Sequence, residues 1–428
     1  MLSLGFMHNT WNTVGRKWFV EWKSVQDTYF VGRLVQSRQD GIFSYAGFFG
    51  HGDVSRYTDQ AELVRHQYDA YIEGKSFSEF NPYKSTTAAQ GMLFSLFDQI
   101  TTHPPQANLS IFRWLTSILS AAVLGLLVVW FYSEYGFVSA LFAGGFMIVS
   151  EWLTLFGGVI YWSLWAFYLP LIALLFYLRK QRSPSDTGKI AVIVFITILI
   201  KCVFNGFAYI TTVLVMVFLP LIYYGVINQW ERRPAINILI ATLVAESLAV
   251  IIALVILVCQ NAVVLGGLGK AFEYIEYSLN KRALGNPGEF SGALAEGLKA
   301  DYFTVLKEYV TGRAIKLDLG FITDRIPGWP IEQLEIGYIW IFYLFLAGSL
   351  LFFLIRSRLP ETGKTRVQSL ILVTWLSVLA PLSWFILFKA HSYLHAHLNF
   401  IIWQIPFTLF GFAMCGAVIQ LSFSKALK

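Results

Sequence analysis

The sequence predicts an all-α integral membrane protein with about nine transmembrane helices and with juxtamembrane amphipathic helices in two extracytoplasmic segments. Of its 428 residues, 56% are hydrophobic and only 14% are charged, a balance that a water-soluble chain of this length does not tolerate. Apolar stretches that cross, or nearly cross, about 30 Å of hydrocarbon recur along the chain. The formal net charge of +6 does not indicate nucleic-acid binding, because cytoplasmic loops of membrane proteins collect Lys and Arg.

The expected spans are apolar stretches separated by polar or charged loops. Two of them, at 137–150 and 189–204, are short, so each is a candidate for a re-entrant or broken helix. The nine stretches lie near residues 111–132, 137–150, 160–178, 189–204, 207–228, 236–260, 337–355, 367–388 and 398–422.

The basic residues of the short loops orient the chain. Twelve Lys or Arg lie at 179–189, 232–233, 356–366 and 425–428, against Lys389 alone in the opposite short loops. The positive-inside rule places the twelve in the cytoplasm. The predicted organisation is then an extracytoplasmic loop at 1–110, transmembrane helices at 111–260, an extracytoplasmic loop at 261–336, and transmembrane helices at 337–428 with an external His cluster at 389–399.

The translocated segment 1–110 predicts a first span ahead of it that this sequence does not contain. Residues 1–7 are too short for a signal peptide or a transmembrane helix. We therefore expect a first span to be missing, either because the start codon is misplaced or because the gene is truncated.

Helical spacing is visible within both external segments. Between Arg16 and Gln39, Trp18, Trp22, Val25 and Tyr29 recur every three to four residues, which predicts an amphipathic helix in the interface plane. Asp40-Gly41 ends it and opens a Gly-rich aromatic stretch. Further expectations are a helix over 59–73, a turn at 285–288, an amphipathic stretch from 293 to 310 and a turn at 326–330.

Asp27 is the carboxylate with the strongest claim to function, because it lies on the expected interfacial helix. The alternative is a structural ion pair with Lys23 one turn earlier, which contributes only a few tenths of a kcal/mol. Asp40 is the second candidate, and its alternative is a turn-forming role beside Gly41.

A second concentration of polar residues lies just before the last span. His391, His395 and His397 fall between Lys389 and Asn399, in a chain with only seven His. If the segment is helical, His391 and His395 share a face and could ligate a divalent metal, although no HExxH glutamate accompanies them. The alternatives are hydrogen-bond donors to a phosphate or sugar, and histidines solvated among lipid headgroups.

Charged residues within the spans form a third group. Lys201 lies near the external end of its span, where it could meet an anionic headgroup or diphosphate, or simply snorkel to the interface. Glu246 lies deeper, and the sequence identifies no partner for it.

Together these features resemble the GT-C superfamily of polytopic glycosyltransferases. The resemblance lies in the order of external loops and spans and in the strings Gln26-Asp-Thr-Tyr-Phe-Val-Gly-Arg33, Gln39-Asp-Gly-Ile-Phe-Ser44, Tyr161-Trp-Ser-Leu-Trp165 and His391 to Asn399. It implies transfer of a sugar from a polyprenyl-phosphate donor to a glycan, lipid or protein acceptor. It places the site on the outer face of a bacterial inner membrane.

The resemblance also implies roles for particular residues. An aspartate of the first external loop acts there as general base, a position that Asp27 fits best and Asp40 second. Cations near the outer leaflet hold the lipid phosphate there, a task that Arg33, Lys201, Lys389, His391, His395 and His397 could perform. Together with Asn399 they are the expected substrate-binding residues. The alternatives to this function are an O-antigen-type polymerase or ligase, and a transporter or flippase of lipid-linked sugars.

Overall fold

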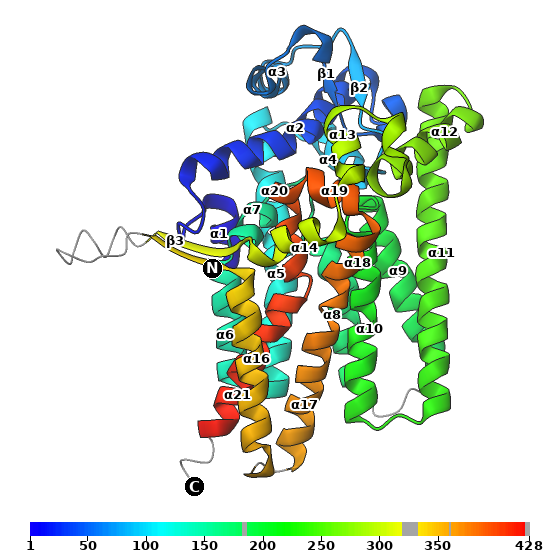
Figure 1. Ribbon diagram of the computed structural model, residues 1–428. Coiled ribbons are helices and arrows are strands. Elements are labelled where there is room, and N and C mark those ends of the chain that lie inside the picture. Colours follow the sequence, from blue (N-terminus) through cyan, green and yellow to red (C-terminus); the bar gives the residue numbers. More distant parts are fainter. Residues whose placement is uncertain (182–185, 319–332, 359–360, 424–428) are drawn as a thin grey trace, which may run out of the picture.

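The computed structural model describes residues 1–181, 186–318, 333–358 and 361–423. Long helices stand side by side in a bundle, and shorter helices with their loops cover one end of it (Figure 1). We call this the capped end; residues 1–104, 151–164, 266–318, 333–337 and 389–404 form it. The opposite, open end holds residues 228–231 and 355–358. The segments that the sequence assigns to one side of the membrane therefore lie at the same end of the bundle.

The bundle has the architecture of a multi-pass membrane protein. Its helices are α5 (Pro105–Tyr135), α6 (Phe137–Val149), α8 (Trp165–Arg179), α9 (Thr187–Asn205), α10 (Ile210–Ile227), α11 (Arg232–Leu265), α16 (Tyr338–Ile355), α17 (Glu361–Leu376), α18 (Leu379–Leu387) and α21 (Phe407–Phe423). Among the residues that the structure describes, seven helical stretches are long and apolar enough to cross a membrane, with α17 and α18 sharing one. The expected count of nine is not confirmed.

Two of the expected spans are shorter than a bilayer requires. The helices α6 and α8 have 13 and 15 residues, or roughly 20 Å of length each, against about 30 Å of hydrocarbon. The expectation for 160–178 was too long, because residues 158–164 form a loop at the capped end and α8 begins only at Trp165. The stretch 189–204 is the opposite case, since α9 is a continuous helix of 19 residues.

The first part of the capped end contains α1 (Leu2–His8), α2 (Arg16–Asp40), α3 (Gln60–Glu73), α4 (Ala89–Ile100), the short turns η1 (Ser44–Gly47) and η2 (Val54–Arg56), and the strands β1 (Gly50–Gly52) and β2 (Phe80–Pro82), which pair antiparallel. The predicted helix over 59–73 is confirmed, and Asp59 caps it by accepting from the backbone N–H of Glu62 at 3.2 Å. The predicted helix from Arg16 is also confirmed. It ends where Gly41 adopts φ 88°, a conformation that favours glycine.

Helix α2 runs across the capped end rather than along the bundle (Figure 1). The stripe expected to lie in the membrane interface packs in part on protein instead. The Trp22 ring is buried, its centroid lies 5.3 Å from that of Phe156, and its Nε1 donates to the Leu155 carbonyl. Trp18, at the start of the helix, stays 39% exposed and is available to lipid headgroups.

The rest of the capped end comes from three later segments. Their elements are α7 (Glu151–Gly157), α12 (Leu268–Leu279), η3 (Asn280–Leu284), η4 (Pro287–Glu289), α13 (Gly292–Lys299), α14 (Tyr302–Thr311), β3 (Arg313–Asp318), β4 (Gln333–Gly337), α19 (Lys389–Leu394), α20 (Ala396–Asn399) and η6 (Phe400–Gln404). The remaining short turn, η5 (Arg356–Arg358), lies at the open end. The amphipathic stretch expected over 293–310 is two helices, because Asp301 interrupts it and caps α14. The expected turn at 285–288 is present as η4, and that at 326–330 lies outside the described residues.

The loop from Tyr83 to Ala88 fastens the capped end to the bundle. Thr87 Oγ1 donates to the Val203 carbonyl of α9 at 2.6 Å, and Gln260 of α11 donates to the Thr87 carbonyl at 3.2 Å. The loop passes so close to Gly206 that a Cβ there would stand 2.8 Å from Thr86 Oγ1. A larger residue at 206 would therefore push the loop away from α9.

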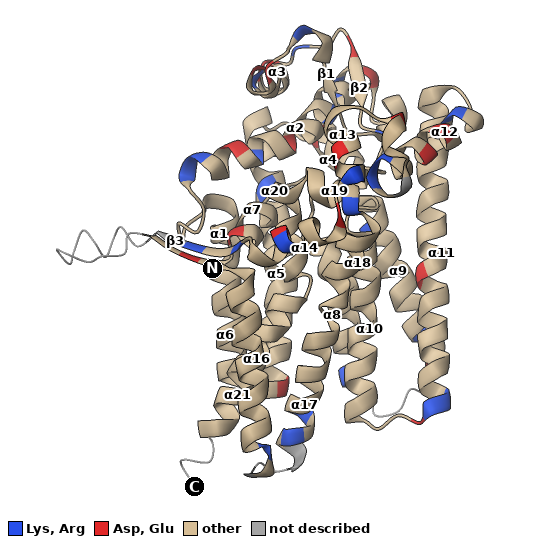
Figure 2. Ribbon diagram, viewed as in Figure 1, with Lys and Arg blue, Asp and Glu red and all other residues tan. Residues whose placement is uncertain are grey.

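Charge is segregated along the bundle axis. Figure 2 shows the helices largely free of Lys, Arg, Asp and Glu along their length, with charged residues gathered at the two ends. The open end carries Arg179, Arg232, Arg233 and Arg356, all from the set that the sequence assigns to the cytoplasm. Arg182, Lys425 and Lys428 of that set lie outside the described residues.

Candidate functional site

A cavity of about 320 Å³ lies where the capped end meets the bundle. The outer part of α11, α12, and α18 with α19 form its sides, and the segments at 83–86, 161–162 and 205–210 complete the wall. Most of this wall is apolar, notably Val250, Leu254 and Leu257 of α11, Trp384 of α18 and Phe388 directly after α18. Cavities of this size that combine an apolar wall with a few polar groups are typical ligand-binding sites.

Arg282 is the charged residue of this wall. It follows α12 in the η3 turn, and its Nη2 donates to Ser85 Oγ at 3.2 Å, which in turn lies 3.2 Å from the Tyr274 hydroxyl. Arg282 forms no ion pair with a carboxylate among the described residues. A guanidinium next to an apolar cavity without a carboxylate partner favours an anionic ligand.

His391 contributes an imidazole to the wall. Its ring lies edge-on to Trp384 at 5.5 Å and 4.6 Å from the ring of His395, so the two histidines share a face of the helical segment as expected. Burial and the nearby His395, Arg282 and Lys281 hold the pKa of His391 well below its usual value. Burial also lowers the pKa of His395 to about 4, so both imidazoles are neutral at pH 7.

The histidine cluster is not assembled as a metal centre. Within the described part of the chain, no three His, Cys, Asp or Glu side chains converge so as to hold a metal ion. The Nδ1 atoms of His391 and His395 are buried, and neither has a hydrogen-bond partner among the described groups. These two unpaired atoms are available to a ligand or to a proton.

The loop from Gly158 to Leu164 supplies an aromatic side to the cavity. Trp162 stacks on Tyr209 with ring centroids 5.6 Å apart, and Tyr161 lies 6.3 Å from Tyr83. Behind Tyr83, Tyr29 stacks on His51 at 3.9 Å, and burial lowers the pKa of His51 to about 4. The conformation of the loop at 158–164 therefore sets the positions of the Tyr161 and Trp162 rings in the cavity wall.

Asp27 lies behind this loop and is not part of the cavity wall. Its side chain is fully buried; Oδ2 accepts from Arg113 Nε at 2.9 Å and Oδ1 accepts from the backbone N–H of Ile160 at 2.8 Å. The neighbouring Gln26 accepts from Trp162 Nε1 at 3.0 Å. In this conformation Asp27 contacts the loop that bears Tyr161 and Trp162, and it does not contact the cavity.

The pairing of Asp27 with Lys23, considered from the sequence, is replaced by the pairing with Arg113. Lys23 Nζ donates instead to the Phe6 carbonyl at 2.9 Å and to the Met7 carbonyl at 3.2 Å. Burial and the charge of Arg113 lower the pKa of Lys23 to about 7. Arg113 lies 86 residues further along the chain, so helical spacing could not indicate it.

Arg33 and Asp40 shape the Gly-rich stretch at the end of α2. The Arg33 guanidinium is buried and donates to the carbonyls of Gly41 and Ser44, while its Nε donates to Ser37 Oγ at 2.8 Å. Asp40 is exposed and accepts a hydrogen bond from Gln36. Neither residue lies on the cavity wall.

The other expected binding residues are spread around the cavity. Lys201 is buried and donates to the Gly206 carbonyl at 2.9 Å, and Lys389 donates to the Leu298 carbonyl at 3.0 Å. Asn399 is buried, and His397 lies 5.8 Å from His395 between ring centroids. Lys201 and Lys389 therefore support the backbone near the cavity, and of the expected site residues His391 alone lines it.

Two important residues of this region, Arg113 and Arg282, were not predicted from the sequence. Arg113 was not identified because its partner is distant in sequence. Arg282 could have been noticed as part of a Lys-Arg pair directly after the amphipathic stretch 268–279, in a segment expected outside the membrane. That pattern places a cation at the surface of the bilayer.

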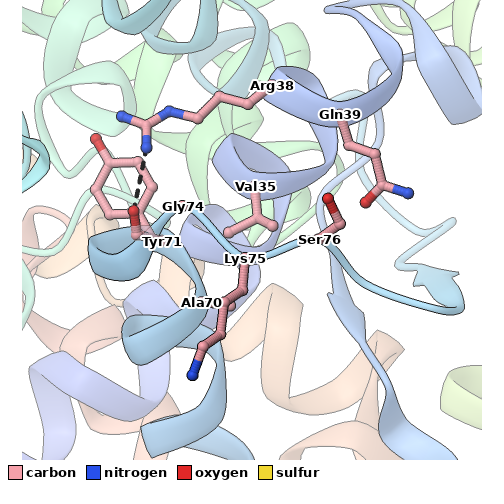
Figure 3. Close-up of a pocket in the computed structure, with 8 residues that line it drawn as sticks. All are labelled: Val35, Arg38, Gln39, Ala70, Tyr71, Gly74, Lys75 and Ser76. Atoms are coloured by element: carbon pink, nitrogen blue, oxygen red, sulfur yellow. Dashed lines mark hydrogen bonds between the residues drawn. The ribbon is translucent and has the colours of Figure 1, made fainter.

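A second, smaller hollow of about 100 Å³ lies between α2 and α3 (Figure 3). Arg38 points along it, pairs with Asp98 at 2.7 Å and donates to the Tyr71 carbonyl at 3.1 Å, the bond dashed in Figure 3. Gln39 both donates to and accepts from the backbone of Phe77. Because Arg38 and Gln39 are already bonded to other protein groups, we assign this hollow a structural role.

Comparison with known proteins adds no family to these observations, since no family model, no curated protein and no solved structure matches the chain.

Proposed function

We propose that this chain is a membrane glycosyltransferase that takes a sugar from a polyprenyl-phosphate donor at the capped end of its bundle. The observation that carries the proposal is the cavity in which an aliphatic stripe of α11 faces an Arg282 that has no carboxylate partner among the described residues. A prenyl phosphate has the same two parts, an apolar chain and an anionic head.

The apolar wall suits the prenyl chain. Val250, Leu254 and Leu257 follow one another along one face of α11, and α11 continues from there through the bundle to Arg232 at the open end. Each CH₂ group removed from water contributes about 0.8 kcal/mol. A chain of several isoprene units along this face would supply most of the binding free energy.

The polar wall suits the head group and the leaving phosphate. Arg282 presents hydrogen-bond donors in a fixed plane, and Tyr274, Ser85 and His391 surround the same cavity. As the acceptor oxygen bonds to the anomeric carbon, the bond from that carbon to the phosphate oxygen breaks, the phosphate keeps the electron pair, and the proton of the acceptor hydroxyl goes to the departing phosphate. Arg282 would stabilise the negative charge that develops on it.

Asp27 acts in this proposal as a positioning residue. It fixes the backbone of Ile160, and thereby the loop whose Tyr161 and Trp162 line the cavity. Glycosyl transfer depends on a donor held in one orientation, so displacement of this loop should reduce transfer.

The test is binding of undecaprenyl phosphate and of undecaprenol to the purified chain in nanodiscs. Binding should require the phosphate, and Arg282→Gln should weaken it about 10- to 100-fold, as expected for loss of a charge-assisted contact. Arg56→Gln is the matched control, because Arg56 is exposed at the capped end away from the cavity. Equal affinity for phosphate and alcohol, or for the wild type and Arg282→Gln, would contradict the proposal.

The reaction itself is tested with a radiolabelled polyprenyl-phosphate sugar and an extract of cell-envelope acceptors. Release of polyprenyl phosphate together with labelled acceptor supports transfer. A ladder of long glycans would instead indicate a polymerase or ligase. Movement of the labelled lipid across liposomes without any product would indicate a transporter.

A further inference from the structure

The neighbourhood of His391 contains positive groups and unpaired nitrogen atoms. Arg282 and Lys281 lie on the η3 turn, and each lowers the pKa of His391 through its charge. Burial and, after it, the charge of Arg282 lower the pKa of Lys281. The Nδ1 atoms of both His391 and His395 are buried without a partner among the described groups. An empty cavity of this kind disfavours additional positive charge.

Among the described residues, no carboxylate enters the electrostatic environment that sets the protonation of His391. The basic and imidazole groups on the packed elements are Lys389, His395 and His397 on the segment 389–399, Lys281 and Arg282 on η3, Lys270 on α12, Lys299 on α13 and Lys307 on α14. The tyrosines are Tyr393 on α19, Tyr209 on α10, Tyr274 and Tyr277 on α12, and Tyr302 and Tyr309 on α14. The carboxylates Glu273, Glu276, Glu296 and Glu308 on these elements are exposed, whereas Glu246 is buried on α11.

We propose that the cavity binds its anionic ligand together with a proton, which the His391–His395 pair takes up. This inference rests on the proposed function, because it deepens the description of the site that would hold the lipid phosphate. The ligand class is a prenyl phosphodiester, the form in which a sugar is attached to a polyprenyl monophosphate.

The physical reason is that a bound anion favours the protonated, positively charged form of a nearby histidine. Burial and, after it, the charge of Arg282 keep the histidines neutral. A phosphodiester placed near Arg282 compensates that charge, so it raises the pKa of His391 and His395. A group whose pKa rises on binding takes up a proton, and affinity then increases as the pH falls. With one proton taken up, the affinity should increase about tenfold per pH unit between the pKa values of the empty and occupied states.

The unpaired Nδ1 atoms of His391 and His395 can accept the proton. In the neutral state an imidazole carries a single N–H, whereas the imidazolium donates from both nitrogen atoms. His391 and His395 have their rings 4.6 Å apart, so a proton on either ring is close to the other. A bound anion would therefore gain a donor that the empty cavity does not offer.

The experiment is isothermal titration calorimetry of the full chain in nanodiscs with farnesyl methyl phosphate. This phosphodiester has one negative charge that does not titrate between pH 5.5 and 8. Titrations at pH 6.5 in buffers of different ionisation enthalpy give the number of protons taken up per lipid, and titrations across this pH range give the slope of affinity. Farnesol, which lacks the phosphate, measures the contribution of the chain alone.

We expect uptake approaching one proton per lipid and a tighter complex at lower pH. The double variant His391→Asn/His395→Asn should bind the lipid without proton uptake and with little pH dependence. His103→Asn is the matched control, because His103 is exposed and does not line the cavity. The wild-type measurement is decisive even if the double variant fails to fold.

The outcomes separate this inference from the function on which it rests. Binding of the phosphodiester with no proton uptake, or uptake that persists in the double variant, would overturn the inference and leave the proposed function standing. No preference for the phosphodiester over farnesol at any pH would overturn both.

Discussion

Replacing Asp27 by Asn tests the buried ion pair behind the cavity wall. The wild-type carboxylate is fully buried, accepts from Arg113 at 2.9 Å and accepts from the Ile160 N–H at 2.8 Å. Asn keeps a carbonyl oxygen that can accept from Ile160 but removes the negative charge. Arg113, whose side chain is 22% exposed, is then left without its ionic partner.

The expected cost follows from the burial of the pair. Breaking a buried ion pair from one side destabilises a protein by about 3–5 kcal/mol, because the remaining charge is uncompensated. Arg113 is partly exposed and still donates to the Tyr68 hydroxyl at 2.8 Å. We therefore expect Asp27→Asn to lower the free energy of unfolding by about 3 kcal/mol, at the lower end of that range.

The assay is equilibrium unfolding in mixed micelles, extended to a double-mutant cycle with Arg113→Met. The double variant removes both charges, so it should be more stable than the sum of the two single effects predicts, with a coupling of about 1–3 kcal/mol. Glu21→Gln is the control: its pair with Lys17 is exposed, so its removal should change stability by less than about 0.5 kcal/mol. Additive single effects, or a cost for Asp27→Asn as small as that of Glu21→Gln, would refute the reasoning.

Two further predictions concern the capped end. Arg33→Gln should speed hydrogen exchange over residues 41–48, and Arg33→Lys should not restore protection, because an ammonium cannot replace the branched guanidinium that contacts Gly41 and Ser44; unchanged exchange in Arg33→Gln would contradict this role. Stability should also fall below pH 6.5, since the unfolded chain takes up a proton that buried His51, with its pKa lowered to about 4, does not. Between pH 7.5 and 5.5 this group alone should lower the free energy of unfolding by roughly 1 kcal/mol. His391 and His395 add to the loss in the same way, so His51→Phe, if it folds, should reduce the total loss by that amount in unfolding measured at both pH values.

Local sequence patterns predicted the elements of this protein well. The helix from Arg16 ends at Gly41 and the helix after Asp59 ends before Gly74, as spacing and capping residues indicated. Hydropathy predicted the multi-pass membrane class, whereas the expected count of nine spans is not confirmed. The bounds of an apolar stretch such as 160–178 were too long because composition alone does not distinguish a loop buried in protein from a helix in lipid.

The candidate site was predicted only in part. The histidine cluster is visible as a local concentration of one residue type, and His391 indeed lines the cavity. Arg33, Lys201 and Lys389 looked like ligands for phosphate, yet their donors are engaged by backbone carbonyls of nearby turns. A sequence shows that a cation is present but not whether the folded backbone already occupies it.

By itself, the sequence determined the membrane class, the segregation of basic loop residues, and the grouping of three external segments, because hydropathy and loop charge act locally along the chain. The tertiary structure decided everything that depends on distant partners. It paired Asp27 with Arg113 and Ile160, brought Arg282 next to His391 across more than a hundred residues, and enclosed the cavity between them. Such contacts arise from the packing of helices, and neither the spacing nor the composition of any one segment encodes them.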